Sequence, residues 1–517
     1  MNGGQALIRT LVHGGVDTCF ANPGTSEMHF VAALDSVPTM RAVLCLFEGV
    51  ATGAADGYGR MAGRPAAALL HLGPGLGNGL ANLHNARRAH TPIVAVVGDH
   101  ATYHKRHDAP LESDIDALAG TVSGWVRRSA RSADVAADAV DAMAAAVRPP
   151  GRVATLILPA DVSWSDGATP AAPRPGRAPA TVAGEVVDQA AAALRSGEPC
   201  VLLLGGAACG PDGLRAADRI AAAGPTRLFC ETFPARLTRG GGLPDVGRLA
   251  YLAEAATEQV RGARHLILAG ARAPVSFFAY PGRPSDLVPD GCDVHVLAEP
   301  GEDAAGALAA LADLLDAPDP ARPAAPARPD RPTGELTAQT AAAAIGALLP
   351  EGAVVCDEAN TSGLWLAGAT AGAPRHDWLT LTGGSIGQGL PLATGAAVAC
   401  PSRPVLCLES DGSAMYTISA LWTQAREGLD VTTVIFNNRS YAILNMELNR
   451  VGAQPAGDAA KNLLDLSRPD LDFVAIATGM GVPAVRATSA EEFSAALARA
   501  LAEPGPHLVE AVIPTFG

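Results

Sequence analysis

The sequence predicts an α/β protein built from three doubly wound, parallel-sheet domains, and three observations support this prediction. Its 517 residues exceed the roughly 250–300 at which a single hydrophobic core stops growing. With 48% hydrophobic and 17% charged residues, the composition favours compact folding over disorder. Short apolar strands alternate with longer helical patterns along the whole chain, which is typical of βαβ units.

Two proline-rich segments, residues 165–180 and 317–332, divide the chain. Such segments favour extended backbone and do not enter a core, so we interpret both as linkers. The expected domains are residues 1–165, 181–317 and 333–517, and they are called the first, central and third blocks of the sequence. Ligands of parallel sheets bind beyond the carboxyl ends of the strands, so the residues that follow each strand are the candidates for chemistry.

Charge and composition narrow the class of partner. The net charge of −14 and the absence of a basic run argue against nucleic acid. The nine cysteines are scattered, with no C-x-x-C and no cluster of histidines that would complete a zinc site, a pattern that suits a reducing cytosol. No stretch approaches the ~18 apolar residues of a membrane span. We therefore expect a cytoplasmic protein that acts on a small molecule, without nucleic-acid or membrane partners.

An acid and an amide follow two strands of the third block. Asp411 comes after the expected strand 405–408, and Asn438 after the strand 431–436, with a helix expected at 415–427. Neighbouring strand ends would bring the two side chains together, and such oxygens are preferred by Mg²⁺. In this interpretation Asn437 and Asn438 both face a metal-bound diphosphate, which the helix N-terminus after Ser413 also contacts. Taken alone, Asp-Gly-Ser is also an ordinary helix-capping turn.

The pattern Ser410-Asp411-Gly412 followed by Asn437-Asn438 resembles the G-D-G and N-N motif of thiamine diphosphate (ThDP) enzymes. Ser410 replaces a glycine of that motif, which makes a positive φ less favourable there. The resemblance implies that Asp411, Asn438 and the backbone carbonyl of Ser440 bind Mg²⁺.

The first block carries a second part of the resemblance. Residues 47–58, FEGVATGAADGY, resemble the family's glutamate-bearing helix, which implies that Glu48 binds N1′ of the aminopyrimidine and activates the cofactor. The ordinary alternative is a glutamate stabilised by the helix dipole, by ~0.3–1 kcal/mol.

Residues 22–27, NPGTSE, resemble the N-P-G-[ST] turn of benzoylformate decarboxylases and acetohydroxyacid synthases, whose hydroxyl faces the reacting carbon; here it is Thr25. Residues 71–78, HLGPGLGN, match their G-P-G-x-x-N loop. Benzoylformate decarboxylases carry His before this loop and acetohydroxyacid synthases carry Thr. A lone histidine is more often structural, but this position favours proton transfer by His71.

In the third block, the resemblance implies polar contacts from residues 358–361, a bend in ThDP imposed by Ile386, and a hydrogen bond to the carbonyl of Gly384. The implied cofactor-binding residues are Asn22, Glu48, Asn360, Thr361, Gly384, Ser385, Ile386, Asp411, Gly412, Ser413, Asn438, Ser440 and Tyr441.

The resemblance implies ThDP- and Mg²⁺-dependent decarboxylation of a small 2-oxo acid such as pyruvate, with carboligation, as in acetolactate synthases. Ile443 favours a small acyl donor by narrowing the pocket. Two alternatives stay open: benzoylformate decarboxylase-like or aldehyde-lyase activity on a larger acyl group, and an inactive paralogue that binds ThDP.

Several hallmarks are missing. Residues 109–112 (APLE) replace the A-F-Q-E of acetohydroxyacid synthases. The vicinal histidines of pyruvate decarboxylases are absent, although His104 and His107 lie nearby. Residues 277–280 (FFAY) lack the middle-domain histidine of benzoylformate decarboxylases.

The central block carries residues 205–208 (GGAA) but no G-x-G-x-x-G, so we expect no FAD there. In the relatives, the glutamate-bearing domain of one subunit faces the diphosphate domain of another. The resemblance therefore implies a homodimer or homotetramer with active sites between subunits.

Overall fold

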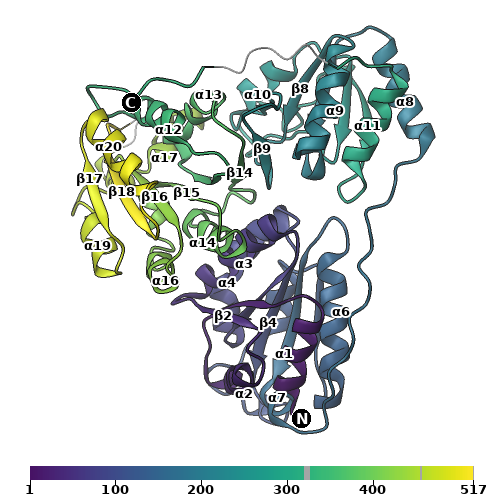
Figure 1. Cartoon of the computed structure of the whole chain (residues 1–517), viewed down its shortest axis with the longest axis vertical. Helices are drawn as coiled ribbons and strands as arrows, with labels where there is room; N and C mark the ends of the chain where they lie inside the picture. The colour runs from purple at the N-terminus through teal and green to yellow at the C-terminus, as the bar shows by residue number, and fades with distance from the viewer. Residues whose placement is uncertain (320–326, 454–456, 516–517) are drawn as a thin grey trace.

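The computed structural model describes residues 1–319, 327–453 and 457–515. It shows three α/β domains, each with a mainly parallel sheet, as predicted (Figure 1). The boundaries between the domains stay a prediction, and residues 320–326 of the second expected linker lie outside the described residues. None of the helices in the described ranges is long and apolar enough to cross a membrane.

The first sheet has the order β2-β1-β3-β4-β6-β5 and is parallel throughout. Its strands are β1 Thr18–Ala21, β2 Arg41–Leu44, β3 Ala66–Leu70, β4 Ile93–Asp99, β5 Trp125–Arg128 and β6 Val153–Pro159. The accompanying helices are α1 Gly3–His13, α2 Met28–Ala33, α3 Glu48–Ala62, α4 Leu72–Arg88, α5 Ile115–Gly120, α6 Val135–Val147 and α7 Ala160–Trp164. β3, β4 and β6 are buried along their whole length, which explains their continuous apolar runs.

The second sheet has the order β10-β8-β7-β11-β12. Its strands are β7 Cys200–Leu204, β8 Thr226–Cys230, β10 Gly247–Arg248, β11 His265–Ala269 and β12 Asp293–Ala298. Its helices are α8 Gly184–Arg195, α9 Pro211–Ala222, α10 Ala253–Val260 and α11 Ala304–Leu314.

The third sheet has the order β17-β18-β16-β15-β13-β14-β9. Its strands are β9 Leu237–Arg239, β13 Val354–Glu358, β14 His376–Thr380, β15 Val405–Ser410, β16 Val431–Asn437, β17 Ala484–Ala487 and β18 His507–Val512. Its helices are α12 Ala338–Leu348, α13 Leu366–Ala369, α14 Gly389–Ala399, α15 Asp411–Ala414, α16 Ala420–Glu427, α17 Ala442–Arg450, α18 Asp458–Leu464, α19 Phe473–Gly479 and α20 Ala490–Ala500. β9 comes from the expected central block and pairs antiparallel with β14, so this sheet is not purely parallel.

The helix expected at 415–427 is only partly present. The chain is helical at Asp411–Ala414, turns, and becomes helical again at Ala420–Glu427. The hydroxyl of Thr417 donates a hydrogen bond to the carbonyl of Gly387, 3.0 Å away, which ties the interruption to a neighbouring loop. The apolar pattern of this segment therefore spans a turn in which Met415 and Tyr416 are exposed, followed by a shorter helix.

Helices α3 and α14 join the first domain to the third, as their crossing in Figure 1 shows. Their contact is close because glycines line it. A Cβ atom added at Gly57 would lie 2.0 Å from the carbonyl oxygen of Leu392, and one at Gly395 would lie 1.8 Å from that of Ala54. The two backbones thus touch directly, and one hydrophobic core runs through both domains.

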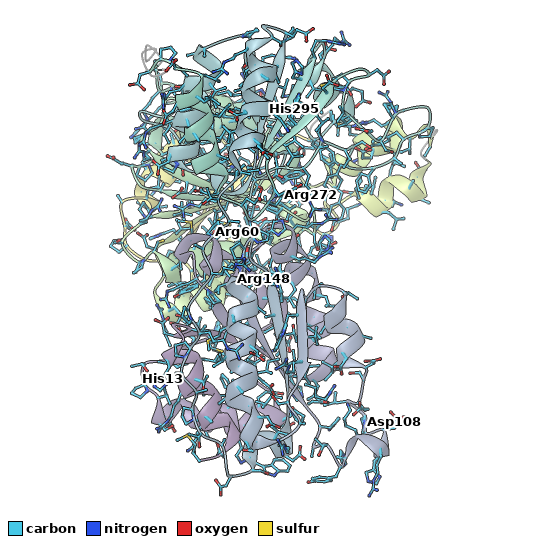
Figure 2. The ribbon with its side chains drawn as sticks, turned by 90° about the vertical axis from the view of Figure 1, so that its right-hand side faces the viewer. His13, Arg60, Asp108, Arg148, Arg272 and His295 are labelled. Atoms are coloured by element: carbon cyan, nitrogen blue, oxygen red, sulfur yellow. The ribbon has the colours of Figure 1, made fainter. Side chains whose placement is uncertain are left out.

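A buried ion pair reinforces this junction. Arg60 on α3 binds both carboxylate oxygens of Asp56, at 2.9 and 2.6 Å. It also donates to the carbonyls of Thr380 (2.8 Å) and Ala235 (3.2 Å) and to the hydroxyl of Thr382 (3.0 Å). Figure 2 shows Arg60 at the level where the first domain meets the rest of the chain. One side chain therefore connects segments of all three expected domains.

Candidate cofactor and substrate site

The register of β15 against β16 places Ser410 opposite Phe436, so Asp411 and Asn438 both follow the carboxyl ends of adjacent strands, as predicted. Asp411 is 2% exposed. Its oxygens accept hydrogen bonds from the backbone N–H groups of Gly412 (2.8 Å) and Arg439 (2.7 Å). Burial raises the pKa of Asp411, and no basic side chain of the described residues pairs with it. A bound cation would relieve this buried charge.

Asn438 and Ser440 flank Arg439, whose N–H bonds to Asp411 at 2.7 Å. The side-chain oxygen of Asn438 accepts from the N–H of Ser440 at 3.0 Å. A carboxylate, an amide oxygen and a backbone carbonyl form the hard donor set that Mg²⁺ prefers, so these residues fit the ion. Asn437 behaves differently: it ends β16, and its amide donates to Glu510 on β18 at 2.7 Å. The amide nitrogen of Asn437 is thus used within the sheet, whereas its oxygen accepts at 3.2 Å from the N–H of Arg439, which also bonds to Asp411; that both asparagines face the diphosphate stays a prediction.

A polar cluster lies beside Asp411. The amide nitrogen of Asn360 is 2.6 Å from the hydroxyl of Ser410 and 3.0 Å from that of Ser413. Ser410 has a φ of −91°, which any residue adopts, so replacing the motif's glycine strains nothing here. The ring of Tyr441 packs against Gly412. These groups and the start of α15 fit a phosphate, while Thr361 is half-buried nearby along the chain.

The loop 383–387 is held by α4 of the first domain. His84 contacts the carbonyl of Gly383 (3.1 Å), and Asn85 donates to the carbonyl of Ser385 (2.7 Å). Gly384 has a φ of +71° and lies against the ring of Phe277, so both its conformation and its space favour glycine. Ile386 in the same loop is half-buried, as a residue that contacts a bound molecule would be.

Glu358 was expected to contact the diphosphate together with residues 359–361, but its buried carboxylate bonds to the backbone instead. Its carboxylate accepts three backbone N–H bonds, from Gly387 (2.7 Å), Gln388 (2.8 Å) and Gly389 (2.5 Å). It therefore caps α14 and fixes the end of the loop 383–387. Burial next to Glu409 raises its pKa.

On the first domain, Glu48 is the first residue of α3 and is 6% exposed. Asn78 on α4 donates to one of its oxygens at 3.0 Å. Asn78 belongs to the G-P-G-x-x-N segment, which forms the first turns of α4 rather than a loop. Its role is therefore to orient the glutamate.

His71 follows β3 and faces Glu27, which follows β1. The Nδ1 atom of His71 is 2.8 Å from a carboxylate oxygen of Glu27, and the hydroxyl of Ser26 is 2.6 Å from the other oxygen. Glu27 is 1% exposed, whereas the side chain of His71 is 20% exposed. This contact favours the tautomer with the proton on Nδ1 and leaves Nε2 available for proton transfer. Glu27 belongs to the N-P-G-T-S-E segment, but no local pattern in the sequence indicates its contact with His71.

The structure thus assembles two half-sites. Thr25, which is exposed, lies with Asn22, Glu48 and His71 on the first domain, and the residues predicted to bind the diphosphate lie on the third. In the parts of the chain that the structure describes, Glu48 and Asp411 share no hydrogen bond or ion pair.

Comparison with known proteins agrees with this division. Residues 1–119 match the family described as thiamine pyrophosphate enzyme, N-terminal TPP binding domain, and residues 359–511 match its C-terminal TPP binding domain. The chain belongs to the thiamine pyrophosphate-dependent enzymes.

Particular relatives extend over the whole chain. A Mycobacterium tuberculosis protein named as a proposed acetolactate synthase large subunit, IlvX, is 68% identical over 100% of both chains. A benzoylformate decarboxylase of Pseudomonas aeruginosa is 31% identical, covering 99% of this chain and 98% of the relative. Among solved structures, a thiamine diphosphate-dependent 4-hydroxybenzoylformate decarboxylase of Rhodococcus jostii superposes with a TM-score of 0.88 at 24% identity, covering 100% of each chain, which supports the fold.

Proposed function

We propose that this protein is a ThDP- and Mg²⁺-dependent enzyme that decarboxylates a 2-oxo acid. The observation that carries the proposal is the Glu27–His71 pair, since it gives a proton-transfer group at the strand ends that also carry Thr25. When bound, ThDP supplies the electron sink for the electron pair that is released as carbon dioxide leaves.

The residues of the chain have separate tasks in this proposal. Asp411, Asn438 and the carbonyl of Ser440 hold Mg²⁺, and Asn360 and Ser413 hold the diphosphate. Glu48, held by Asn78, would bind N1′ of the aminopyrimidine and hold a proton there when the cofactor is present. His71 delivers or removes a proton at the substrate, and general acid–base catalysis of this kind raises the reaction rate of enzymes by about 10²–10⁴-fold.

Two candidate reactions differ in the size of the acyl group and in what happens to it after decarboxylation. Ile443 on α17 and the likeness to a protein named as an acetolactate synthase favour a small, pyruvate-like donor followed by carboligation. The His71–Glu27 pair and a cavity of about 250 Å³ beside Thr25 favour a benzoylformate decarboxylase-like reaction on a larger acyl group. In both candidate reactions the central domain binds no FAD. Purified protein without visible flavin absorption would agree with this.

We further propose a cytoplasmic homodimer or homotetramer with active sites between subunits. Apolar side chains are exposed beside both half-sites: Leu46 before Glu48 is 50% exposed, and Tyr416 after Asp411 is 56% exposed. A second copy would cover them and bring Glu48 to the diphosphate residues of its partner. Analytical ultracentrifugation checks the assembly.

The test is carbon dioxide release from a panel of 2-oxo acids with ThDP and Mg²⁺. Turnover of at least one acid, reduced by about 10²–10⁴-fold in Glu48→Gln, is the expected result. Turnover of none would reject the proposal and favour a binding protein without activity. An unchanged rate in Glu48→Gln would remove Glu48 from the mechanism.

A further inference from the structure

A cavity of about 250 Å³ opens beside Thr25 and Ser26. Its wall includes His100 and His104, which belong to the loop after β4, and the aromatic ring of Trp164 at the end of α7. The remainder of the lining is mostly apolar. One water molecule needs roughly 10–15 Å³ on the same measure, so the cavity takes several atoms of a substrate beyond its reacting carbonyl.

His100 has an unused hydrogen-bonding atom in this region. Its Nε2 is buried and has no partner among the described residues. An unpaired buried polar atom of this kind destabilises the folded protein, and a bound partner or an ordered water would recover that loss. The ring of His104 lies 5.4 Å from that of His100, centroid to centroid, so two imidazoles face the same space.

The side chains that line the cavity favour a ligand whose hydrogen-bond acceptor group carries negative charge. No Asp, Glu, Asn or Gln side chain is among the cavity residues that the structure describes. The nearby cation Lys105 is already paired, at 3.2 Å with Asp99 and 2.5 Å with Glu112. Besides the hydroxyls of Thr25, Ser26 and Tyr103, the lining carries the imidazoles of His100 and His104, and Nε2 of His100 has no partner among the described residues. An imidazole N–H can donate to a carboxylate whether the ring is neutral or charged.

We propose that His100 and His104 bind a second carboxylate, at the far end of the 2-oxo acid, so that the substrate class is a dicarboxylic 2-oxo acid. Thr25 and Ser26 then adjoin the reacting end, and the apolar part of the cavity contacts the carbon chain between the two ends. This inference rests on the proposed decarboxylase function and makes His100 and His104 specificity residues.

Binding is measured first, without turnover. The probes are glutarate and its uncharged-ended counterpart glutaramate, added to the protein loaded with ThDP and Mg²⁺, with Trp164 fluorescence as the readout and Trp164→Phe to identify the signal. Glutarate should bind at least about tenfold more tightly than glutaramate, because a hydrogen bond to a charged group is worth more than one to a neutral group. His100→Leu and His104→Leu should each remove the difference.

His107→Leu is the matched control, because His107 stacks on His104, at 5.6 Å between centroids, but does not line the cavity. It should keep the preference. Equal binding of the two probes by the unaltered protein, or loss of the preference in His107→Leu as well, would overturn the proposal. Thermal melting of each variant separates misfolding from loss of the site, and His100→Gln, which keeps a donor, should retain part of the preference if the donor matters.

Turnover measurements test whether the carboxylate bound by His100 and His104 belongs to the 2-oxo acid that is decarboxylated. The ratio of kcat/KM for 2-oxoglutarate over 2-oxopentanoate should exceed about ten and fall toward one in His100→Leu. If the unaltered protein prefers 2-oxopentanoate, the donor assignment is wrong. Absence of any decarboxylation would reject the proposed function, while preferential glutarate binding would still support a carboxylate site, so the two failures differ.

Discussion

Replacing Arg60 by methionine tests how the domains are joined. Its side chain is 2% exposed and its partner Asp56 is 0% exposed, so Arg60→Met leaves a buried carboxylate without its cation. Breaking one partner of such a pair costs about 3–5 kcal/mol. The three bonds from Arg60 to Thr380, Thr382 and Ala235 are lost as well, which places the expected cost at the upper end of that range.

The matched control is Arg64→Met, just beyond the end of the same helix. Arg64 pairs with Asp17 at 2.8 Å, but the two side chains are 44% and 41% exposed, so solvent weakens the pair to about 0–1 kcal/mol. Urea unfolding followed by circular dichroism should show a large loss for Arg60→Met and little change for Arg64→Met.

A second readout is calorimetric affinity for ThDP with Mg²⁺. Thr380 and Thr382 lead into the loop 383–387, so Arg60→Met should also weaken binding of the cofactor. Equal unfolding midpoints for the two variants would refute the view that Arg60 holds the domains together.

Three other variants test separate parts of the site and the fold. Glu27→Gln should lower kcat by about 10²–10⁴-fold and change the pH profile, because an amide does not hold the Nδ1 proton of His71 as a carboxylate does; a rate near that of the unaltered protein would remove Glu27 from the mechanism. Asp411→Ala should abolish the heat of ThDP association in the presence of Mg²⁺, since it removes the carboxylate of the proposed metal site, and unchanged heat would contradict that site. Burial raises the pKa of Glu231 from 4.5 to about 7, so its contribution to stability is fully present below about pH 4.5 and is lost as the pH rises through about 7. In Glu231→Gln, thermal melting between pH 5 and pH 8 should therefore lack a decline worth roughly 2–3 kcal/mol, and identical pH dependence in the two proteins would show that Glu231 is not its source.

The sequence predicted the parts of the fold that depend on local pattern. Apolar runs such as Ile93–Asp99 and Val405–Ser410 are fully or almost fully buried strands, so alternation with helices was enough to predict parallel sheets. The same alternation predicted that Asp411 and Asn438 lie close together, because residues that follow adjacent parallel strands share one edge of the sheet.

Features set by tertiary contacts were not predictable in this way. β9 is only three residues long, and its pairing with β14 depends on how the central and third domains meet. The contact between Glu27 and His71 joins residues 44 positions apart, so no local signal indicated it. The bond from the amide of Asn437 to Glu510, 73 positions further along the chain, was not predictable either, because it depends on the pairing of β16 with β18.

The glycine-lined contact between α3 and α14 has a consequence for how molecules enter and leave. Since Gly57 and Gly395 bring the two backbones together without intervening side chains, a hinge between these helices would have to break a continuous apolar seam. The first and third domains should therefore move as one rigid unit during turnover. The path of a substrate into the cavity beside Thr25 would then depend on the loop after β4, which lines that cavity and whose residue Asp108 lies at the outer end of the first domain, far from Arg60 (Figure 2).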